Sequence, residues 1–163
     1  MEILGTLDLG PARVALRRAQ ASDVPVIVGL LAADQLGATR DGIGCAEDLA
    51  AYQAAFEAID RDPAHLLIVA QAGPDIAATM QLSFLPGLAR RGALRAQIEA
   101  VRVDAAYRNR GLGAALCTWA INESRRRQCA LVQLTTDKSR PSAHRFYERL
   151  GFAATHEGMK LLL

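Results

Sequence analysis

The sequence has few cysteines, no long apolar run and no marked excess of either charge. Its three cysteines, Cys45, Cys117 and Cys129, are odd in number and show no CxxC spacing, so we expect neither a disulfide framework nor a zinc knuckle. No apolar stretch approaches the ~20 residues that span a bilayer. The 19 basic and 17 acidic residues leave a net charge of +2, which argues against a polyelectrolyte nucleic-acid binder but allows a local anion site.

The length and composition are those of one globular domain. The chain has 163 residues, of which 51% are apolar and 22% charged, and it contains no repeat or low-complexity linker. We take residues 1–163 as a single domain, with residues 1–12 as a candidate peripheral N-terminal segment. Residues 1–5 lack the basic and then apolar pattern of a signal peptide. We therefore expect a cytoplasmic protein that binds neither nucleic acid nor membrane.

Periodicity and turn residues predict the element order β-α-α-β-β-β-α-β-α-β, a mixed α/β domain around one sheet. The first helix is expected to follow an N-cap at Ser22, and the last to run from Pro141 to a C-terminal glycine at Gly151. Two further helices are expected around residues 49–59 and 112–127. The predicted strands cover residues 14–18, 66–70, 76–84, 94–103, 131–135 and 155–163.

The strand predicted to end at Val103 changes the phase of its apolar alternation. Its apolar positions up to Ile98 follow one phase, whereas Val101 and Val103 follow the other. A side-chain period of two does not allow such a slip in a regular strand. A β-bulge near residues 99–100 would return both sets to one face. The alternative is that residues 93–97 form the exposed end of a twisted strand.

The segment that follows this strand has the features of an anion site. Residues 108–114 read Arg-Asn-Arg-Gly-Leu-Gly-Ala and enter a predicted helix. The first amides of a helix lack internal partners, and the helix dipole adds partial positive charge there. Gly111 and Gly113 let a ligand approach the backbone, while Arg108 and Arg110 add full charges. A phosphate or pyrophosphate is the expected ligand.

Two common nucleotide motifs do not fit this segment. A dinucleotide fingerprint needs a third glycine or an alanine where Leu116 stands, and no Gly-Lys-Ser/Thr follows as in a Walker A loop. No metal-ligating cluster stands out in the sequence either, so no metal cofactor is expected. From the residues alone, a domain that binds a nucleotide unrelated to coenzyme A remains an alternative.

Two motifs resemble the GCN5-related N-acetyltransferase (GNAT) family. Arg108-x-x-Gly111-x-Gly113 matches its (Gln/Arg)-x-x-Gly-x-(Gly/Ala) signature, and residues 143–152, Ala-His-Arg-Phe-Tyr-Glu-Arg-Leu-Gly-Phe, look like its Ala-x-x-Phe-Tyr…Gly-Phe helix. The resemblance is strongest from Ile98 to Phe152. It implies an α/β (α+β) domain whose mixed, mostly antiparallel sheet contains a bulged, splayed strand pair and is flanked by about four helices.

The resemblance also implies acetyl-CoA as cosubstrate. The helix-entry amides would hold its pyrophosphate, two valines of the bulged strand would pair with its pantetheine arm, and the amide of Val101 would bind the thioester carbonyl. The cofactor-binding residues implied in this way are Val101, Val103, Arg108, Asn109, Arg110, Gly111, Leu112, Gly113 and Ala114.

Two residues are candidates for proton transfer. The resemblance implies Tyr147 as the general acid that protonates the departing thiolate; the alternative is a packing residue on its helix. Glu99, at the proposed bulge, is our candidate general base for the attacking amine, directly or through a water, and its alternative is a solvent-facing strand glutamate. Asp137 lies where the family often has an asparagine that contacts the cofactor, and its role stays open.

The function predicted on this basis is N-acetylation of a primary amine by direct attack on acetyl-CoA in a ternary complex. The acceptor is a small molecule or a peptide, and we place its pocket between residues 34–46, the second helix and the last strand. The alternative function is a non-catalytic acyl-CoA-binding regulatory domain. A homodimer is an open expectation that rests on analogy with the family.

Overall fold

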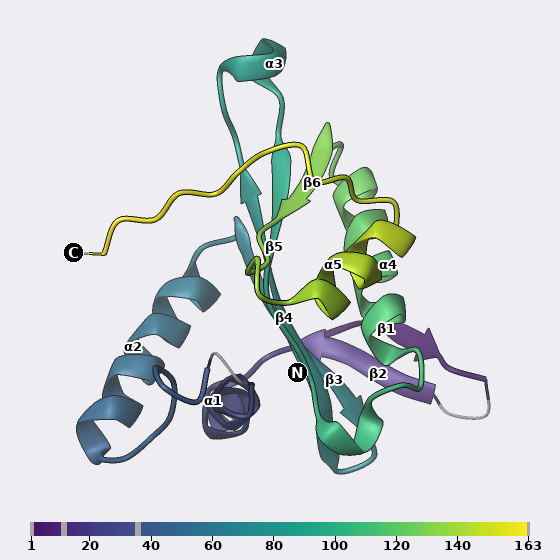
Figure 1. Cartoon of the computed structure of the whole chain (residues 1–163). Helices are drawn as coiled ribbons and strands as arrows, with labels where there is room; N and C mark the ends of the chain where they lie inside the picture. The colour runs from purple at the N-terminus through teal and green to yellow at the C-terminus, as the bar shows by residue number, and fades with distance from the viewer. Residues whose placement is uncertain (1, 11–12, 35–36, 163) are drawn as a thin grey trace.

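A computed structural model of the chain describes residues 2–10, 13–34 and 37–162. Its centre is a six-stranded sheet in the order β1-β2-β3-β4-β5-β6, drawn in Figure 1. Neighbouring strands are antiparallel except β5 and β6, which are parallel. The expected mixed, mostly antiparallel sheet is therefore confirmed. The strands are β1 (Ile3–Asp8), β2 (Arg13–Arg18), β3 (His65–Ala72), β4 (Asp75–Leu85), β5 (Arg95–Val103) and β6 (Leu131–Leu134).

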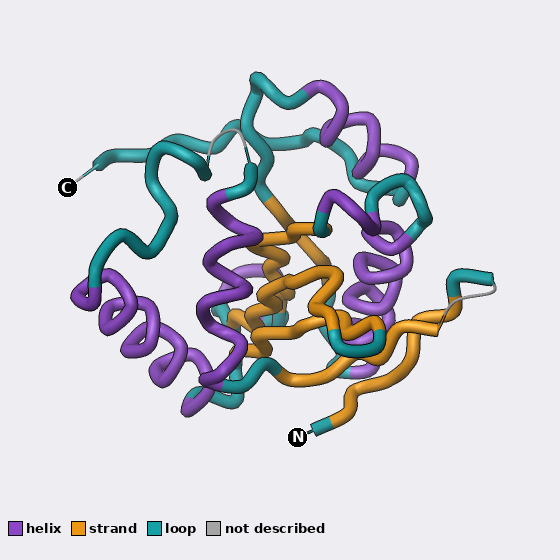
Figure 2. Tube along the Cα trace, turned by 90° about the horizontal axis from the view of Figure 1, so that it is seen from below, coloured by secondary structure: helices purple, strands orange, loops and turns teal. Residues whose placement is uncertain are grey.

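Helices cover both faces of the sheet. α1 and α2 lie on one face, and α4 lies on the other with α5 beside it (Figures 1 and 2). The short α3 lies at the tip of the arm that joins β4 to β5 (Figure 1). The helices are α1 (Val24–Ala32), α2 (Ala46–Arg61), α3 (Ala89–Gly92), α4 (Leu112–Arg126) and α5 (Pro141–Arg149), with 3₁₀ turns at Ala21–Asp23 and Ala105–Tyr107.

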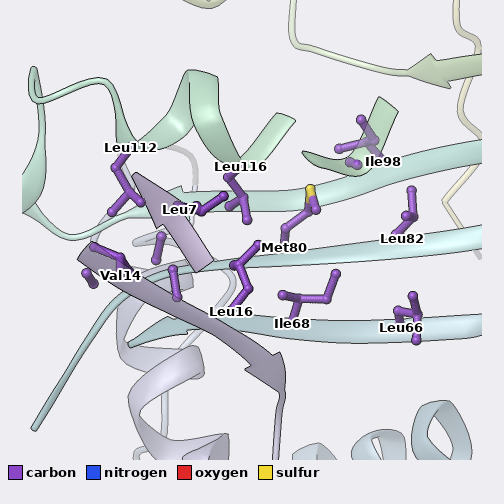
Figure 3. Close-up of a cluster of buried hydrophobic side chains, with 14 of the residues drawn as sticks. Leu7, Val14, Leu16, Leu66, Ile68, Met80, Leu82, Ile98, Leu112 and Leu116 are labelled. Atoms are coloured by element: carbon purple, nitrogen blue, oxygen red, sulfur yellow. The ribbon is translucent and has the colours of Figure 1, made fainter. Parts of the chain in front are cut away.

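The strand alternation divides the core into two clusters, one on each face. The larger cluster lies under α4 and contains Leu16, Ile68 and Met80, all fully buried (Figure 3). The smaller cluster lies under α1 and α2, where Val69 packs with Phe56. Neighbouring strand residues point to opposite faces, so the continuous apolar run of β3 supplies both clusters. Each fully buried aliphatic side chain contributes about 1.5–3 kcal/mol.

Two expectations about the N-terminal part were incomplete or wrong. Residues 3–8, which belong to the segment set aside as peripheral, form the edge strand β1 and pair with β2. Ser22 is not an N-cap; it lies inside the 3₁₀ turn Ala21–Asp23. The turn is fixed instead by the Asp23 carboxylate, which accepts a 2.7 Å hydrogen bond from the Gln20 amide. A tertiary partner of Asp23, Arg17 at 2.6 Å, decides this local geometry, and local sequence does not show it.

The last predicted strand is wrong. Residues 155–162 form no strand, and Leu163 lies outside the described residues. The segment leaves α5 and extends away from it (Figure 1), with Met159, Leu161 and Leu162 exposed at 94%, 85% and 92%. Apolar content made these residues look like a strand, but a strand also needs a neighbouring edge with which to pair.

Candidate functional site

The bulge expected in β5 is present. The β4–β5 register shifts between Thr79 and Gln81, so that Ala100 and Val101 together stand opposite a single residue of β4. Ala100 has a φ of 53°, in the left-handed region that non-glycine residues seldom occupy. Residues before and after the bulge contribute to the same core cluster. The phase slip in the sequence therefore has the cause that was predicted for it.

β5 and β6 stop pairing just before the bulge. Their parallel pairing begins at Arg95 with Leu131 and ends at Ile98 with Leu134, whereas β5 continues to Val103 on the side of β4. A cavity of about 70 Å³ lies where the pairing stops, lined by β5, the end of β6 and the first turns of α5. This volume suits a small reacting group and not a whole cofactor, since one water needs about 10–15 Å³.

The loop before α4 presents backbone amides. Asp104 fixes its start by accepting a 2.8 Å hydrogen bond from the Ala106 amide, and both Asn109 (φ 60°) and Gly111 (φ 81°) are left-handed. Gly111 is the N-cap of α4 and has no side chain to cap it. Leu112 anchors the first turn, because its side chain is buried in the core. The first amides of α4 are thus held in place without a capping side chain, as an anion site requires.

Gly113 brings the two sequence motifs together. A Cβ atom at this position would lie 3.6 Å from Phe146 Cζ on α5 and 3.6 Å from Val103 Cγ2 on β5. The start of α4 therefore packs closely between the bulged strand and the helix that carries Tyr147. Three separate elements of the chain meet at this contact, and Phe146 is the neighbour of Tyr147 in α5.

The two predicted anion-binding arginines lie at the surface with their own contacts. Arg108 Nε donates a 3.0 Å hydrogen bond to the Val103 carbonyl, one of the backbone groups expected to pair with a pantetheine arm. Arg110 lies 5.9 Å from the ring centroid of Tyr107, whose hydroxyl donates to Asp75 at 3.0 Å. Arg108 would have to release the carbonyl if a cofactor arm paired there.

Tyr147 lines the cavity between β5 and β6. Its ring meets Phe146 edge-on at 5.0 Å and Phe152 at 5.9 Å, so it is held rigidly at the end of α5. Burial raises the pKa of Tyr147 to about 12, which keeps the phenol protonated at neutral pH. A fixed, protonated phenol beside a cavity has the properties of a general acid, although the same contacts also make it a packing residue.

Glu99 reaches the same cavity from the other wall. It lies on β5 immediately before the bulge, pairs in register with Gln81, and is exposed. The structure therefore brings Glu99, Val101 and Tyr147 around one space. An exposed carboxylate can accept a proton directly or through water, so the geometry is compatible with the predicted role.

Asp137, whose role stayed open, forms the turn before α5. Its carboxylate accepts hydrogen bonds from the amide of Ser139 at 2.9 Å and from its hydroxyl at 2.6 Å, and the Ser139 hydroxyl is the first cause of a lowered pKa at Asp137. The carbonyl of Asp137 lies 3.0 Å from His144 Nε2. These contacts give the side chains of Asp137 and His144 a structural role, which is to hold the loop before α5 in place.

The structure adds three site residues that sequence reasoning did not single out. Arg102 lies on β5 just after the bulge, Arg140 precedes α5, and both pair with Asp34 at the end of α1. Asp34 does fall within the acceptor region expected at residues 34–46, of which residues 35–36 lie outside the described chain. The sequence offered one sign of this cluster. Arg102 is a charged residue between Val101 and Val103, which both pack against the core.

Other parts of the expected acceptor pocket have different roles. The last strand cannot contribute as a strand, because residues 155–162 do not form one. Asp48 of α2 accepts from the amides of Gly44 at 2.9 Å and Cys45 at 3.1 Å, which commits its carboxylate to capping α2. A larger open hollow of about 640 Å³ lies along β1 and β2 and shares no lining residue with the cavity at Tyr147. The smaller cavity is the one that adjoins the predicted catalytic residues.

The described residues contain neither a cluster of metal ligands nor a helix suited to a membrane. Across residues 2–10, 13–34 and 37–162, no cluster of three or more His, Cys, Asp or Glu side chains could hold a metal ion. In the same described ranges, no helix combines the length and apolarity needed to cross a membrane.

The chain belongs to the acetyltransferase (GNAT) family, whose family model matches residues 34–152. A solved structure described as a transcriptional regulator from Bacillus halodurans C-125 is 43% identical, with a TM-score of 0.87 over 92% of this chain and 99% of that one. An acetyltransferase structure from Trypanosoma brucei is 28% identical, with a TM-score of 0.72 over 92% and 99% of the two chains.

A curated relative is similar over part of its length. The glucosamine 6-phosphate N-acetyltransferase of Trypanosoma brucei brucei is 39% identical over 87 residues, which are 53% of this chain and 56% of the relative. The chain thus matches little more than half of that enzyme.

Proposed function

We propose that the protein is an N-acetyltransferase that transfers the acetyl group of acetyl-CoA to a primary amine by direct attack in a ternary complex. Family membership supports the class of reaction. The observation that carries the proposal is the cavity where β5 and β6 stop pairing, which has Tyr147 and the bulge in its wall. The start of α4, whose N-cap is a glycine, packs through Gly113 against Phe146, the neighbour of Tyr147.

The residues present fit acetyl-CoA, which would supply the acetyl thioester. The amides from Asn109 to Ala114 would hold the pyrophosphate, with Arg108 and Arg110 adding charge. Past the point where β6 stops pairing with β5, the pantetheine arm would pair with the backbone of Val101 and Val103. It would replace Arg102 Nη1 and Arg108 Nε, which donate to their carbonyls at 2.9 and 3.0 Å. No metal takes part in this proposal.

The chemistry divides among three groups. The Val101 amide, fixed by the bulge, stabilises the charge that develops on the thioester carbonyl oxygen. As the amine nitrogen bonds to the acetyl carbon, the carbon–sulfur bond breaks and the Tyr147 hydroxyl donates its proton to the departing thiolate. Glu99 accepts the surplus proton of the amine, directly or through a water. The products are an N-acetylated amine and free coenzyme A.

The Tyr147→Phe variant tests this function. Loss of a general acid should lower turnover by about 10²–10⁴-fold, while the dissociation constant of acetyl-CoA, measured by calorimetry, should change less than about twofold. Tyr52→Phe is the matched control, because it removes a phenol on α2 that accepts from the Gly42 amide at 3.2 Å and does not line the cavity at Tyr147. Equal losses of turnover and binding in Tyr147→Phe would show that the tyrosine only packs.

The alternative function is a non-catalytic acyl-CoA-binding regulatory domain. A structure that is 43% identical to this chain is described as a transcriptional regulator, which favours this alternative. Such a domain would use the backbone amides at the start of α4 to bind its ligand, but it would not need Tyr147 or Glu99. Acetyl-CoA binding without thiol release across a broad set of amines would support it, and thiol release with any amine would exclude it.

The acceptor that we propose is a small-molecule or peptide amine. The curated relative is named for a small amino sugar phosphate, which supports small molecules as the first to be screened. The cysteines at 45, 117 and 129 are all free thiols, which suits our proposal that the enzyme works in a reducing cytoplasm.

We also propose a homodimer joined by the C-terminal segment. Met159, Leu161 and Leu162 are exposed, and β6 is the last strand of the sheet, so its outer edge faces no other strand of the described chain. A second copy offers the same edge to this segment, and reciprocal pairing would satisfy both. Light scattering should give a dimer for the full chain and a monomer for a chain ending at Ala154. A monomeric full chain would contradict the proposal.

A further inference from the structure

Unpaired buried polar atoms gather at the catalytic cavity. Among the described residues, the buried side-chain atoms without a hydrogen-bond partner are Asp34 Oδ2, Arg102 Nε and Thr136 Oγ1. Arg102 and Thr136 line the cavity, and Asp34 is paired with Arg102. Buried polar groups in proteins are nearly always satisfied by protein or by water, so these atoms give this place free hydrogen-bonding capacity for a polar ligand.

The charges at this place are close together but poorly matched. Arg102 Nη2 lies 3.2 Å from Asp34 Oδ2 without hydrogen-bond alignment, and Arg140 Nη2 lies 3.3 Å from Asp34 Oδ1. Two guanidinium groups thus share one carboxylate. The side chains of Arg102 and Asp34 are only 15% and 14% exposed, and burial is the main cause of a lowered pKa at Arg102. Asp34 therefore compensates the buried charge incompletely.

A carboxylate also lines this cavity, on the same strand as Arg102. Glu99 lines the cavity together with Arg102 and Arg140, and its carboxylate is our candidate acceptor of the amine proton. A ligand with an ammonium group at one end and an anion at the other would match this arrangement. Arg102 Nη1 already donates to the Val101 carbonyl at 2.9 Å, but a simple amine would leave Arg102 Nε and the Thr136 hydroxyl unpaired.

We propose that the acceptor carries an anionic group, a carboxylate or a phosphate monoester, in addition to its amine, and that Arg102 and Arg140 bind this anion. The inference rests on the proposed acetyltransferase function. Guanidinium groups present forks of N–H donors that suit both kinds of anion, and the Thr136 hydroxyl supplies a further donor. Selection is expected to be strong, because a site with buried donors rejects analogues that leave them unpaired.

Matched acceptors test the inference. Glucosamine 6-phosphate against glucosamine, and glutamate or glycine against the corresponding amides, differ in one anionic group, and thiol release from acetyl-CoA reports turnover. We expect kcat/KM at least about tenfold higher for the anionic member of one pair, and the productive pair identifies phosphate or carboxylate. Equal use of neutral partners would overturn the inference and leave the acetyltransferase standing. No thiol release from these or from a wider amine set would contradict the proposed function itself.

Variants locate the binding group. Arg102→Gln and Arg140→Gln should each raise the KM of the anionic acceptor by roughly 10–100-fold, the range for a charged hydrogen bond, while the KM of the neutral acceptor and of acetyl-CoA change less than about twofold. Arg140 is 37% exposed, so its variant keeps the test valid if Arg102→Gln does not fold. Arg145→Gln, which removes an exposed charge from α5, is the control. An equal effect of all three variants would overturn the assignment.

Discussion

Two arginine–aspartate clusters, built from the same residue types, differ in how completely they are satisfied. Arg17 binds Asp23 through two contacts of 2.6 and 3.0 Å, and its Nε donates to Gln71 at 2.6 Å. The cluster at the cavity has contacts of 3.2 and 3.3 Å and leaves Arg102 Nε and Asp34 Oδ2 without hydrogen bonds among the described residues. We call the first cluster closed, because its charged groups are hydrogen-bonded to one another, and the second open, because it keeps unpaired polar atoms.

The difference separates a structural role from a binding role. Burial raises the pKa of Asp23. The hydrogen bonds from Arg17 and the Gln20 amide, together with the charge of Arg17, lower the pKa by more than burial raises it, so the net shift is downward. At Arg102 the balance goes the other way, and burial outweighs the attraction of Asp34. A closed cluster fixes the 3₁₀ turn before α1, whereas an open cluster keeps donors available for a ligand.

The largest expected effect is on folding stability. Asp23→Ala leaves the buried Arg17 charge unpaired and should lower the free energy of unfolding by about 3–5 kcal/mol, as measured by urea denaturation. The KM values of the remaining folded enzyme should not change. Asp60→Ala is the control, since Asp60 pairs with Arg18 only at the surface and at 3.6 Å, and it should cost less than about 1 kcal/mol.

A smaller effect is expected at the open cluster. Asp34→Ala should lower the free energy of unfolding by about 1–2 kcal/mol, because its contacts with Arg102 and Arg140 are longer and lack full hydrogen-bond alignment. The same urea titration measures it. A cost equal to that of Asp23→Ala would remove the distinction between the two clusters.

The smallest expected effect is a loss of stability confined to acid. The pKa of Asp23 is lower in the folded protein than its ordinary value of 3.8, so its contribution is complete above the unfolded pKa and disappears as pH falls through the folded pKa. Urea titrations between pH 7 and pH 3 should show a steeper acid loss in the unmodified protein than in Asp23→Asn. Parallel curves would show that Asp23 contributes nothing to this loss.

Local signals predicted the bulge of β5 and the end of α5 well. The phase slip around Ile98 and Val101 predicted the bulge. In a strand with a side-chain period of two, a bulge is needed to keep the apolar residues before and after the slip in one core. Gly151 ends α5 in the left-handed conformation (φ 92°), as its place after the helix predicted. Such features depend on backbone geometry within a few residues, which the sequence displays directly.

The cluster of Asp34, Arg102 and Arg140 was not visible in the same way. Asp34, Arg102 and Arg140 come from three separate parts of the chain and meet only when β5, α1 and the loop before α5 are assembled. The edge strand β1 and the unpaired segment 155–162 also depend on which strand edges are available. Apolar pattern predicts burial, but it does not say where the partner of a strand lies.

The cysteines determine how cleanly a colorimetric disulfide reagent can follow coenzyme A. Cys117 is a buried residue of α4, and burial raises its pKa to about 12, so it should not react with such a reagent. Cys45 is exposed at the start of α2 and would contribute a background burst of its own. Cys45 is the N-cap of α2, and serine is a favoured N-cap residue. Cys45→Ser therefore removes this background while keeping the start of α2 intact.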